Sequence, residues 1–195
     1  IVTRPAAECA KWVDALAQTG FPCEALPLIA VGPAPDPDAV RAAWTRIDSF
    51  DAVMFVSGNA VANFFALKPA SALVFTAQAA IKTRAFVIGP GSQAALQKAG
   101  VDAVFIDAPD LQTGQFDSEA LWAVVGPRVV PGFRVLVVRG MGDASMAADV
   151  GDGAGRNWFA NHVKAAGGQI EFVVAYQRCV PQWTDAQANL ARTAA

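Results

Sequence analysis

Short continuous runs of apolar residues alternate along this chain with longer segments in which apolar residues recur every three or four positions. The short runs are typical of β-strands buried on both faces, and the longer spacing is typical of helices with one buried face. Strands are expected at 51–56, 84–88, 101–106, 133–138 and 169–175. Helices are expected at 38–47, at 117–125 and at 157–166. One further helix is expected to begin near residue 60, and another follows the turn at 89–92 and ends at residue 98. This alternation predicts an α/β fold with a parallel sheet, in which ligands bind beyond the carboxyl ends of the strands.

The first 37 residues follow a different order. A short strand at 1–3 leads into a helix at 6–20, and a second strand is expected at 24–31. Residues 32–37 contain three prolines, which neither pair inside a sheet nor enter a helix interior, so this segment is predicted to be a linker. Two strands and one helix are too few to bury a core of their own, because so small a unit falls short of offsetting chain entropy.

Composition narrows the class of protein. The 195 residues, 54% of them hydrophobic, suffice for one large domain or two small ones. A net charge of −2, from 15 basic and 17 acidic residues, excludes the basic stripe of a nucleic-acid-binding protein. No apolar run approaches the roughly 18 residues that a membrane-spanning helix needs. Residues 1–5 lack the pattern of a signal peptide, and a start at Ile1 indicates a trimmed front. Because the three cysteines form no disulfide framework, a reducing cytoplasm is the expected compartment.

Several common site patterns can be set aside. The three cysteines are widely spaced and fit neither a disulfide framework nor a zinc site. The single histidine, His162, cannot hold a metal alone and is expected at the surface or hydrogen-bonded. The glycines at 89 and 91 lack the third glycine of a dinucleotide-binding turn. The aspartates of the glycine-rich stretch 141–155 do not have EF-hand spacing, and a loop is predicted there.

Polar turns follow the predicted strands and carry the candidate binding residues. Two of these turns open helices, whose free N–H groups and positive dipole ends favour anions, and two others contribute guanidinium groups. The residues concerned are Arg4, Ser57, Gly58, Asn59, Gly89, Ser92, Arg139 and Gly140. Plainer roles remain open for Ser57 and Ser92 as helix N-caps and for Arg4 in a surface ion pair. Taken together, the turns predict a cleft for a ligand with several carboxylates or phosphates.

Tyr176 is the only tyrosine, and it stands where an apolar strand turns polar. A phenol with an ordinary pKa of about 10 is protonated at neutral pH and can donate a hydrogen bond or a proton. A half-buried aromatic at the end of a strand is the alternative interpretation of this residue.

Five short motifs occur in an order that closely resembles the uroporphyrinogen-III synthase family. They are Val2–Pro5, Phe55–Val61, Ile88–Ala94, Val138–Gly140 and Ala175–Arg178. The resemblance runs from residue 1 to about 180, and its specificity lies in the order and spacing of the motifs.

The resemblance implies two flavodoxin-like parallel-sheet domains joined by a two-stranded linker. One domain is discontinuous and, in this chain, incomplete: it would contain 1–31 and 181–195. The linker strands would be 32–37 and 175–180, and 38–174 would form the continuous α/β domain.

The resemblance also implies an activity, which is closure of linear hydroxymethylbilane into uroporphyrinogen III with inversion of the last pyrrole ring. No metal or organic cofactor is implied, and a monomer is expected. The matching tyrosine, Tyr176, would help the hydroxyl of the hydroxymethyl group to leave as water. Ser57 matches a serine of the family, Ser92 stands where the family usually has threonine, and Arg4 and Arg139 match basic positions at the cleft.

Two departures from the family pattern affect these expectations. The family has a second arginine soon after its Arg-Gly turn, but here 141–155 intervenes before Arg156. Family members also continue beyond the point that corresponds to Ala195, so the 195-residue chain alone is expected to be inactive or nearly so. The alternatives are a non-catalytic tetrapyrrole- or polyanion-binding module with the same fold, and an unrelated protein of the periplasmic-binding type.

Overall fold

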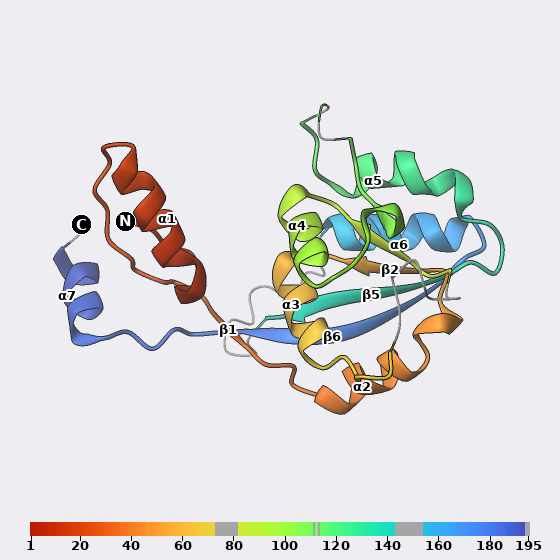
Figure 1. Ribbon diagram of the computed structural model, residues 1–195, viewed down its shortest axis with the longest axis horizontal. Coiled ribbons are helices and arrows are strands. Elements are labelled where there is room, and N and C mark those ends of the chain that lie inside the picture. The colour runs from red at the N-terminus through yellow and green to blue at the C-terminus, as the bar shows by residue number, and fades with distance from the viewer. Residues whose placement is uncertain (73–81, 111, 113, 143–153, 194–195) are drawn as a thin grey trace.

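The chain forms two lobes of unequal size (Figure 1). The computed structural model describes residues 1–72, 82–110, 112, 114–142 and 154–193. We call residues 30–179 the large lobe, and residues 1–29 together with 180–193 the small lobe. The predicted loop at 141–155, with its three aspartates, lies almost entirely outside the described residues.

A six-stranded sheet runs through the large lobe in the order β1-β6-β5-β2-β3-β4. The strands are β1 (Ala30–Gly32), β2 (Ala52–Phe55), β3 (Arg84–Val87), β4 (Ile106–Asp107), β5 (Arg134–Met141) and β6 (Gln169–Cys179). Only β1 is antiparallel to its neighbour, and the other pairings are parallel. The predicted α/β fold with a mainly parallel sheet is therefore confirmed.

Helices cover both faces of this sheet because alternate residues of each strand point to opposite faces. Val53, Phe55 and Leu136 pack in one core cluster with α2 (Pro37–Thr45), α3 (Gly58–Ala66) and α4 (Pro90–Lys98). Met54 and Val137 pack in a second cluster with α5 (Ser118–Val125) and α6 (Ala154–Ala165). We call these the α3 face and the α6 face.

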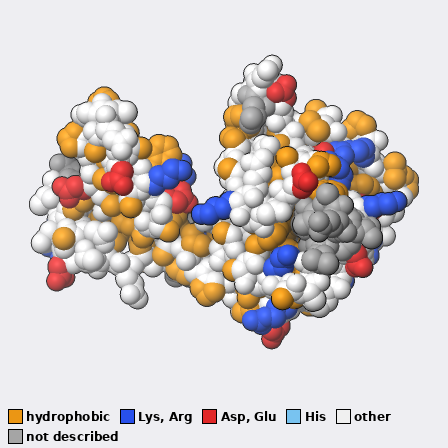
Figure 2. Space-filling view, in the orientation of Figure 1, with side chains coloured by type: hydrophobic (Ala, Val, Ile, Leu, Met, Phe, Trp, Pro, Cys, Tyr) orange, Lys and Arg blue, Asp and Glu red, His pale blue; other side chains and the backbone are white. Residues whose placement is uncertain are grey.

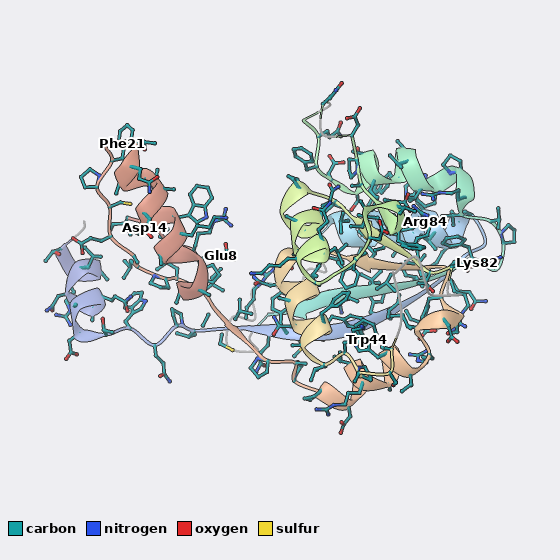
Figure 3. All side chains as sticks on the ribbon, viewed as in Figure 1. Glu8, Asp14, Phe21, Trp44, Lys82 and Arg84 are labelled. Carbon is teal, nitrogen blue, oxygen red and sulfur yellow. The ribbon has the colours of Figure 1, made fainter. Side chains whose placement is uncertain are left out.

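The α3 face is anchored by stacked aromatic rings. The rings of Trp44 and Phe64 lie 4.4 Å apart between centroids, and the indole N–H of Trp44 donates to the carbonyl oxygen of Phe64 at 2.9 Å. Trp44 sits on α2 beneath the sheet (Figure 3). A buried indole needs such a partner, and this one ties α2 to the end of α3.

The strand order differs from the flavodoxin order that the resemblance implied. Numbered along the chain, the five parallel strands lie in the order 3-2-1-4-5, whereas a flavodoxin-like sheet has the order 2-1-3-4-5. After β3 the chain continues outward to β4 at the edge of the sheet and does not return past β2. The topological switch point consequently lies between β2 and β5.

Two predicted strands are shorter than expected. Within 101–106 the Asp102 carboxylate accepts a hydrogen bond from the backbone N–H of Val104, and a 3₁₀ turn forms at Ala103–Phe105, which leaves only β4 for pairing. In 24–31, Pro27 has no N–H to donate to a ladder. That segment therefore gives one parallel bridge, between Val2 and Ala25, and then β1.

The small lobe contains α1 (Ala6–Gln18) and α7 (Asp185–Thr193), with the Val2–Ala25 bridge beside them. Its two chain segments enter the large lobe side by side through β1 and the end of β6 (Figure 1). Gly32 pairs with Gln177 and Ala30 with Cys179, so the connection is a short antiparallel ladder. Of the predicted linker residues 32–37, Gly32 ends β1 and Pro37 begins α2. The division into two domains stays a prediction.

Candidate functional site

A cleft of about 400 Å³ lies between the two lobes, beyond the carboxyl ends of the neighbouring strands β2 and β3. Figure 2 shows the notch between the lobes, with Lys or Arg side chains near its floor and on its small-lobe wall. The cleft is lined by Arg4, Glu8, Ser57, Gly58, Asn59, Ile88, Gly89, Gly91, Ser92 and Phe116. Six of the nine residues predicted for the site are in this lining.

The large-lobe wall consists of two helix N-termini. Ser57 caps α3, where its Oγ accepts the N–H of Ala60 at 3.1 Å. Gly89 precedes α4 and has no side chain to cap it. The two helices pack closely, since a Cβ on Gly58 would lie 3.6 Å from the carbonyl oxygen of Gly91. Their positive ends thus converge on one side of the cleft, which favours an anionic ligand.

The small-lobe wall pairs a base with an acid. The Arg4 guanidinium lies 3.6 Å from the carboxylate of Glu8 and 5.3 Å from the ring centre of Trp12. Figure 3 shows Glu8 on the side of α1 that faces the large lobe. The ion-pair role left open for Arg4 is therefore present in the structure, and it coexists with a place in the cleft wall.

Tyr176 lies directly behind the large-lobe wall of the cleft. Its side chain is 4% exposed, and its hydroxyl oxygen is 3.2 Å from the Oγ of Ser57. Tyr176 is not among the lining residues, so the phenol reaches the cleft through Ser57. The half-buried aromatic expected at the end of a strand is instead fully buried within strand β6.

A β-bulge turns Tyr176 toward Ser57. Arg139 pairs with Val174 and Gly140 pairs with Tyr176, which leaves Ala175 as an extra residue on β6. Without the bulge, Ala175 and Tyr176 would point to opposite faces of the sheet. Because of it, both belong to the core cluster of the α3 face.

The structure places Arg139 on the other side of the sheet. Val138 belongs to the α3 face, and Val137 belongs to the α6 face. Because side chains alternate along a strand, Arg139 points to the α6 face, as Val137 does. Its guanidinium carbon lies 4.9 Å from the ring centre of Phe172. Neither Arg139 nor Gly140 lines the cleft. Arg156 lies in the first turn of α6, but its side chain is outside the described residues.

Four lining residues were not predicted from the sequence: Glu8, Ile88, Gly91 and Phe116. Ile88 and Gly91 belong to the same turn as Gly89 and Ser92, so their position follows from that turn. Glu8 lies in the first turn of α1, and Arg4 lies just before this helix, so the four-residue spacing brings their side chains within ion-pair distance. Phe116 carries no signal in the sequence, because its place depends on how the segment before α5 folds back.

Among the described residues, two carboxyl groups have lowered pKa values, and neither lines the cleft. The pKa of Asp117 is lowered by the N–H of Ala120 and the side chain of Gln115, as expected for the N-cap of α5. Burial raises the pKa of Glu171, but hydrogen bonds and charge from Arg46 and Arg134 outweigh it and bring this pKa below its ordinary value. These groups act on helix and sheet stability.

The described residues contain no group of three or more His, Cys, Asp or Glu side chains that could bind a metal ion. His162 stacks on Trp158 with 3.6 Å between ring centres, and its Nδ1 lies 2.9 Å from the carbonyl oxygen of Trp158. This contact agrees with the satisfied histidine expected from the sequence. In the described part of the chain, no helix has the length and apolar character that a bilayer crossing requires.

A family model described as uroporphyrinogen-III synthase HemD matches residues 10–194. The chain belongs to the uroporphyrinogen-III synthase family. This match covers both lobes and the cleft, with the exception of Arg4 and Glu8 on its small-lobe wall.

A solved structure of the same family supports the fold. A mutant uroporphyrinogen III synthase from the extremely thermophilic bacterium Thermus thermophilus superposes with a TM-score of 0.52 at 14% sequence identity. That match covers 90% of this chain and 60% of the other. The wild-type enzyme from the same bacterium gives a TM-score of 0.47 at 16% identity, over 88% of this chain and 59% of the other. The chain thus spans about 60% of the length of the solved structures that it matches.

Proposed function

We propose that the chain is part of a uroporphyrinogen-III synthase, a hydro-lyase of tetrapyrrole (heme) biosynthesis that cyclises hydroxymethylbilane with loss of water and inversion of the terminal ring. The observation that carries this proposal is the 3.2 Å contact between Tyr176 and Ser57, located behind a cleft that two helix N-termini line. A phenol joined to a hydroxyl at an anion-binding cleft suits a polycarboxylate substrate that must lose a hydroxyl group.

The cleft wall fits the substrate class electrostatically. Hydroxymethylbilane carries eight carboxylates, and the N-termini of α3 and α4 offer them N–H donors and partial positive charge. On the opposite wall Arg4 supplies a full charge, which Glu8 partly offsets. We assign substrate binding to Arg4, Ser57, Gly58, Asn59, Gly89 and Ser92. Arg139 and Gly140 have no such place in the cleft wall.

The hydrogen bonds of the Ser57 hydroxyl connect the phenol of Tyr176 to the cleft. A serine hydroxyl has two acceptor lone pairs and one donor. The N–H of Ala60 occupies one lone pair of Ser57, and Tyr176 occupies the other when its O–H is the donor. The single O–H of Ser57 then points to the cleft, toward the hydroxyl that leaves.

Proton transfer from Tyr176 through Ser57 would let the hydroxyl of the substrate leave as water. The leaving hydroxyl takes a proton from Ser57, which takes one from Tyr176; the C–O bond breaks, and water departs to leave a protonated azafulvene beside the Tyr176 phenolate. The terminal ring attacks through its substituted carbon to give a spiro intermediate, in which the old bridge bond to that carbon breaks and re-forms at the free α-carbon of the same ring. That carbon then loses its proton, and the proton returns through Ser57 to restore the phenol. Because this chemistry is intrinsically facile, much of the catalytic effect would come from holding the folded conformer. The proposal involves no cofactor.

The remaining expectations stay proposals of the same kind. We place 1–31 and 181–195 in a discontinuous domain, 38–174 in a continuous one, and the linker strands at 32–37 and 175–180. This division is supported by the fraction of the solved structures that the chain spans. A monomer in the cytoplasm is expected.

The deciding experiment supplies hydroxymethylbilane to the protein that carries this sequence at its natural length and separates the type I and type III products. Formation of type III isomer above the spontaneous background supports the proposal. Only type I product at the spontaneous rate would instead indicate a non-catalytic binding module. The 195-residue chain assayed in parallel is expected to show little or no type III product.

Replacing Tyr176 with Phe is expected to lower the rate of type III formation by about a hundredfold, at the low end of what general acid catalysis contributes. Ser57→Ala should lower it similarly, and the double variant should be no slower than the slower single variant, because the two groups act in one relay. Additive losses would refute the relay.

A matched control separates this effect from helix capping. Ser57→Ala removes an N-cap, which costs about 1 kcal/mol of stability. Asp36→Ala removes the N-cap of α2, where the carboxylate accepts from the N–H of Ala39 at 2.9 Å, without touching the cleft. Asp36→Ala should therefore destabilise the protein and leave the rate nearly unchanged.

A further inference from the structure

Gly140 lies beneath the ring of Tyr176 with no room for a side chain. A Cβ placed on Gly140 would lie 2.3 Å from Cζ, 2.5 Å from Cε2 and 2.7 Å from Cε1 of Tyr176. These are the shortest such distances among the described glycines. Gly140 is not one of the glycines with positive φ, so its backbone conformation does not require glycine. Close approach of the tyrosine ring is therefore what demands a glycine here.

The sheet order explains why the ring passes over this residue. Tyr176 belongs to β6 and Ser57 follows β2, but β5 lies between these two strands. Since neighbouring strands are about 4.8 Å apart, the phenol has to cross roughly 10 Å from its own strand to the position of Ser57. It crosses β5 at Gly140, its direct partner in the ladder. Any side chain at that position would stand in its path.

We propose that Gly140 is a positioning residue, which seats the ring of Tyr176 across β5 so that its hydroxyl reaches Ser57. This inference rests on the proposed function in assigning the seated phenol a catalytic purpose. It gives Gly140 a different role from the substrate contact suggested by the family motif, and it agrees with the absence of Gly140 from the cleft lining. The bulge and the glycine work together, because the bulge turns the ring to the α3 face and the glycine lets it lie flat there.

The first test measures the seating of the ring and needs no enzymatic activity. Tyr176 is the only tyrosine, so nitration by tetranitromethane reports on this phenol alone. Gly140→Ala should raise the nitration rate by at least about tenfold, because an overpacked ring is displaced from its buried site. The control is Gly142→Ala, two residues along the chain, where a Cβ would meet nothing within 4 Å. Tyr176 in the Gly142→Ala variant should be nitrated at the same rate as in the chain without substitutions. Equal nitration rates in that chain, in Gly140→Ala and in Gly142→Ala would overturn the proposal.

Urea denaturation of the single and double variants tests whether Gly140→Ala destabilises the protein through Tyr176, even if Gly140→Ala folds poorly. Gly140→Ala should lower the urea midpoint in the chain that has Tyr176. In a Tyr176→Ala background the same substitution should have no further effect, because the ring that it meets is gone. If Gly140→Ala is unfolded and Tyr176→Ala does not restore folding, the clash lies elsewhere and the proposal fails.

The kinetic test separates positioning from substrate contact. In the protein of natural length, Gly140→Ala should lower kcat for type III formation about as much as Tyr176→Phe, with KM changed less than about threefold. It should cause no further loss in a Tyr176→Phe background. A KM increase of about tenfold in both backgrounds would assign Gly140 to substrate binding instead. If Tyr176→Phe keeps full activity while the nitration and stability results hold, Gly140 seats the ring and the proposed function of Tyr176 is what fails.

Discussion

The two lobes contain helices of similar amphipathic character but bury them to very different extents. In the large lobe, α3 buries Ala60, Val61 and Phe64 in nine residues. In the small lobe, α1 is 13 residues long and buries only Cys9, while Trp12 is 44% exposed and Phe21, just after the helix, is 68% exposed. Hydrophobic spacing therefore indicates which face of a helix can be buried, and only a complementary sheet makes that burial happen.

The candidate site unites both kinds of structure. Its large-lobe wall, with Ser57 and Tyr176, is fixed by the sheet and the packed helices. Its small-lobe wall depends on the Val2–Ala25 bridge and on a few contacts with the C-terminal segment, such as the 2.6 Å hydrogen bond from the indole of Trp183 to the carbonyl oxygen of Pro27. We expect the first wall to be preformed and the second to be adjustable.

The largest expected contrast is in packing. Phe64→Ala should cost about 3–5 kcal/mol of unfolding free energy, because it leaves a cavity beside Trp44 and Phe55. Trp12→Ala should cost less than about 1 kcal/mol, since it removes only an exposed ring near Arg4. Urea denaturation measures both. Equal losses would show that α1 shares the main core and would break the contrast between the lobes.

Hydrogen exchange should sharpen the same contrast without any substitution. Amide protons of β2 and β5 should exchange only through global unfolding, because these strands lie in the interior of the sheet. The amides of Val2 and Leu26 donate within the small lobe, to Glu24 and Val2, and should be at least about a hundredfold less protected. Mass spectrometry of peptides from the two regions measures this. Similar protection would mean that the lobes open as one unit.

The smallest expected effect concerns the carboxylates. Glu171 joins Arg46 and Arg134 at 2.6 and 3.0 Å, whereas Glu8, in the first turn of α1, meets the single cation of Arg4 at 3.6 Å. Because folding lowers the pKa of Glu171 below its ordinary value of 4.5, its stabilisation is present above that pH and is lost as the pH falls through the folded-state pKa. The side chain is partly exposed, so Glu171→Gln should cost only about 0.5–1 kcal/mol at pH 7.

The control for this prediction is Glu8→Gln, which should change stability by no more than about a few tenths of a kcal/mol, as is usual for an exposed ion pair. Urea midpoints of Glu171→Gln and the original chain should converge as the pH falls through the folded-state pKa of Glu171, which lies below 4.5. A difference that is independent of pH would mean that Glu171 stabilises the lobe through packing and not through its charge.

Much of this architecture was already present in the sequence. Continuous apolar strands such as 51–56 and 133–138 predicted the parallel sheet, because strands buried on both faces have no polar alternation. The turns Ser57–Asn59 and Gly89–Ser92 were predicted to meet, since the carboxyl ends of parallel strands share one edge of a sheet. Both turns line the cleft.

Other features depended on partners that are distant along the chain. The strand order was decided by the outward path of the chain after β3, to β4 at the edge of the sheet. The face to which Tyr176 points was decided by a single extra residue in β6, which strict alternation cannot reveal.

The sequence by itself thus determined the fold class and the anion-favouring turns, and it made the single tyrosine a candidate, because these follow from local composition and spacing. The tertiary structure alone decided that Tyr176 crosses β5 over Gly140 to reach Ser57, and that Arg139 turns away to the α6 face. The physical reason is that orientation in a sheet depends on pairing register, and register is set by contacts between strands that lie far apart in the chain.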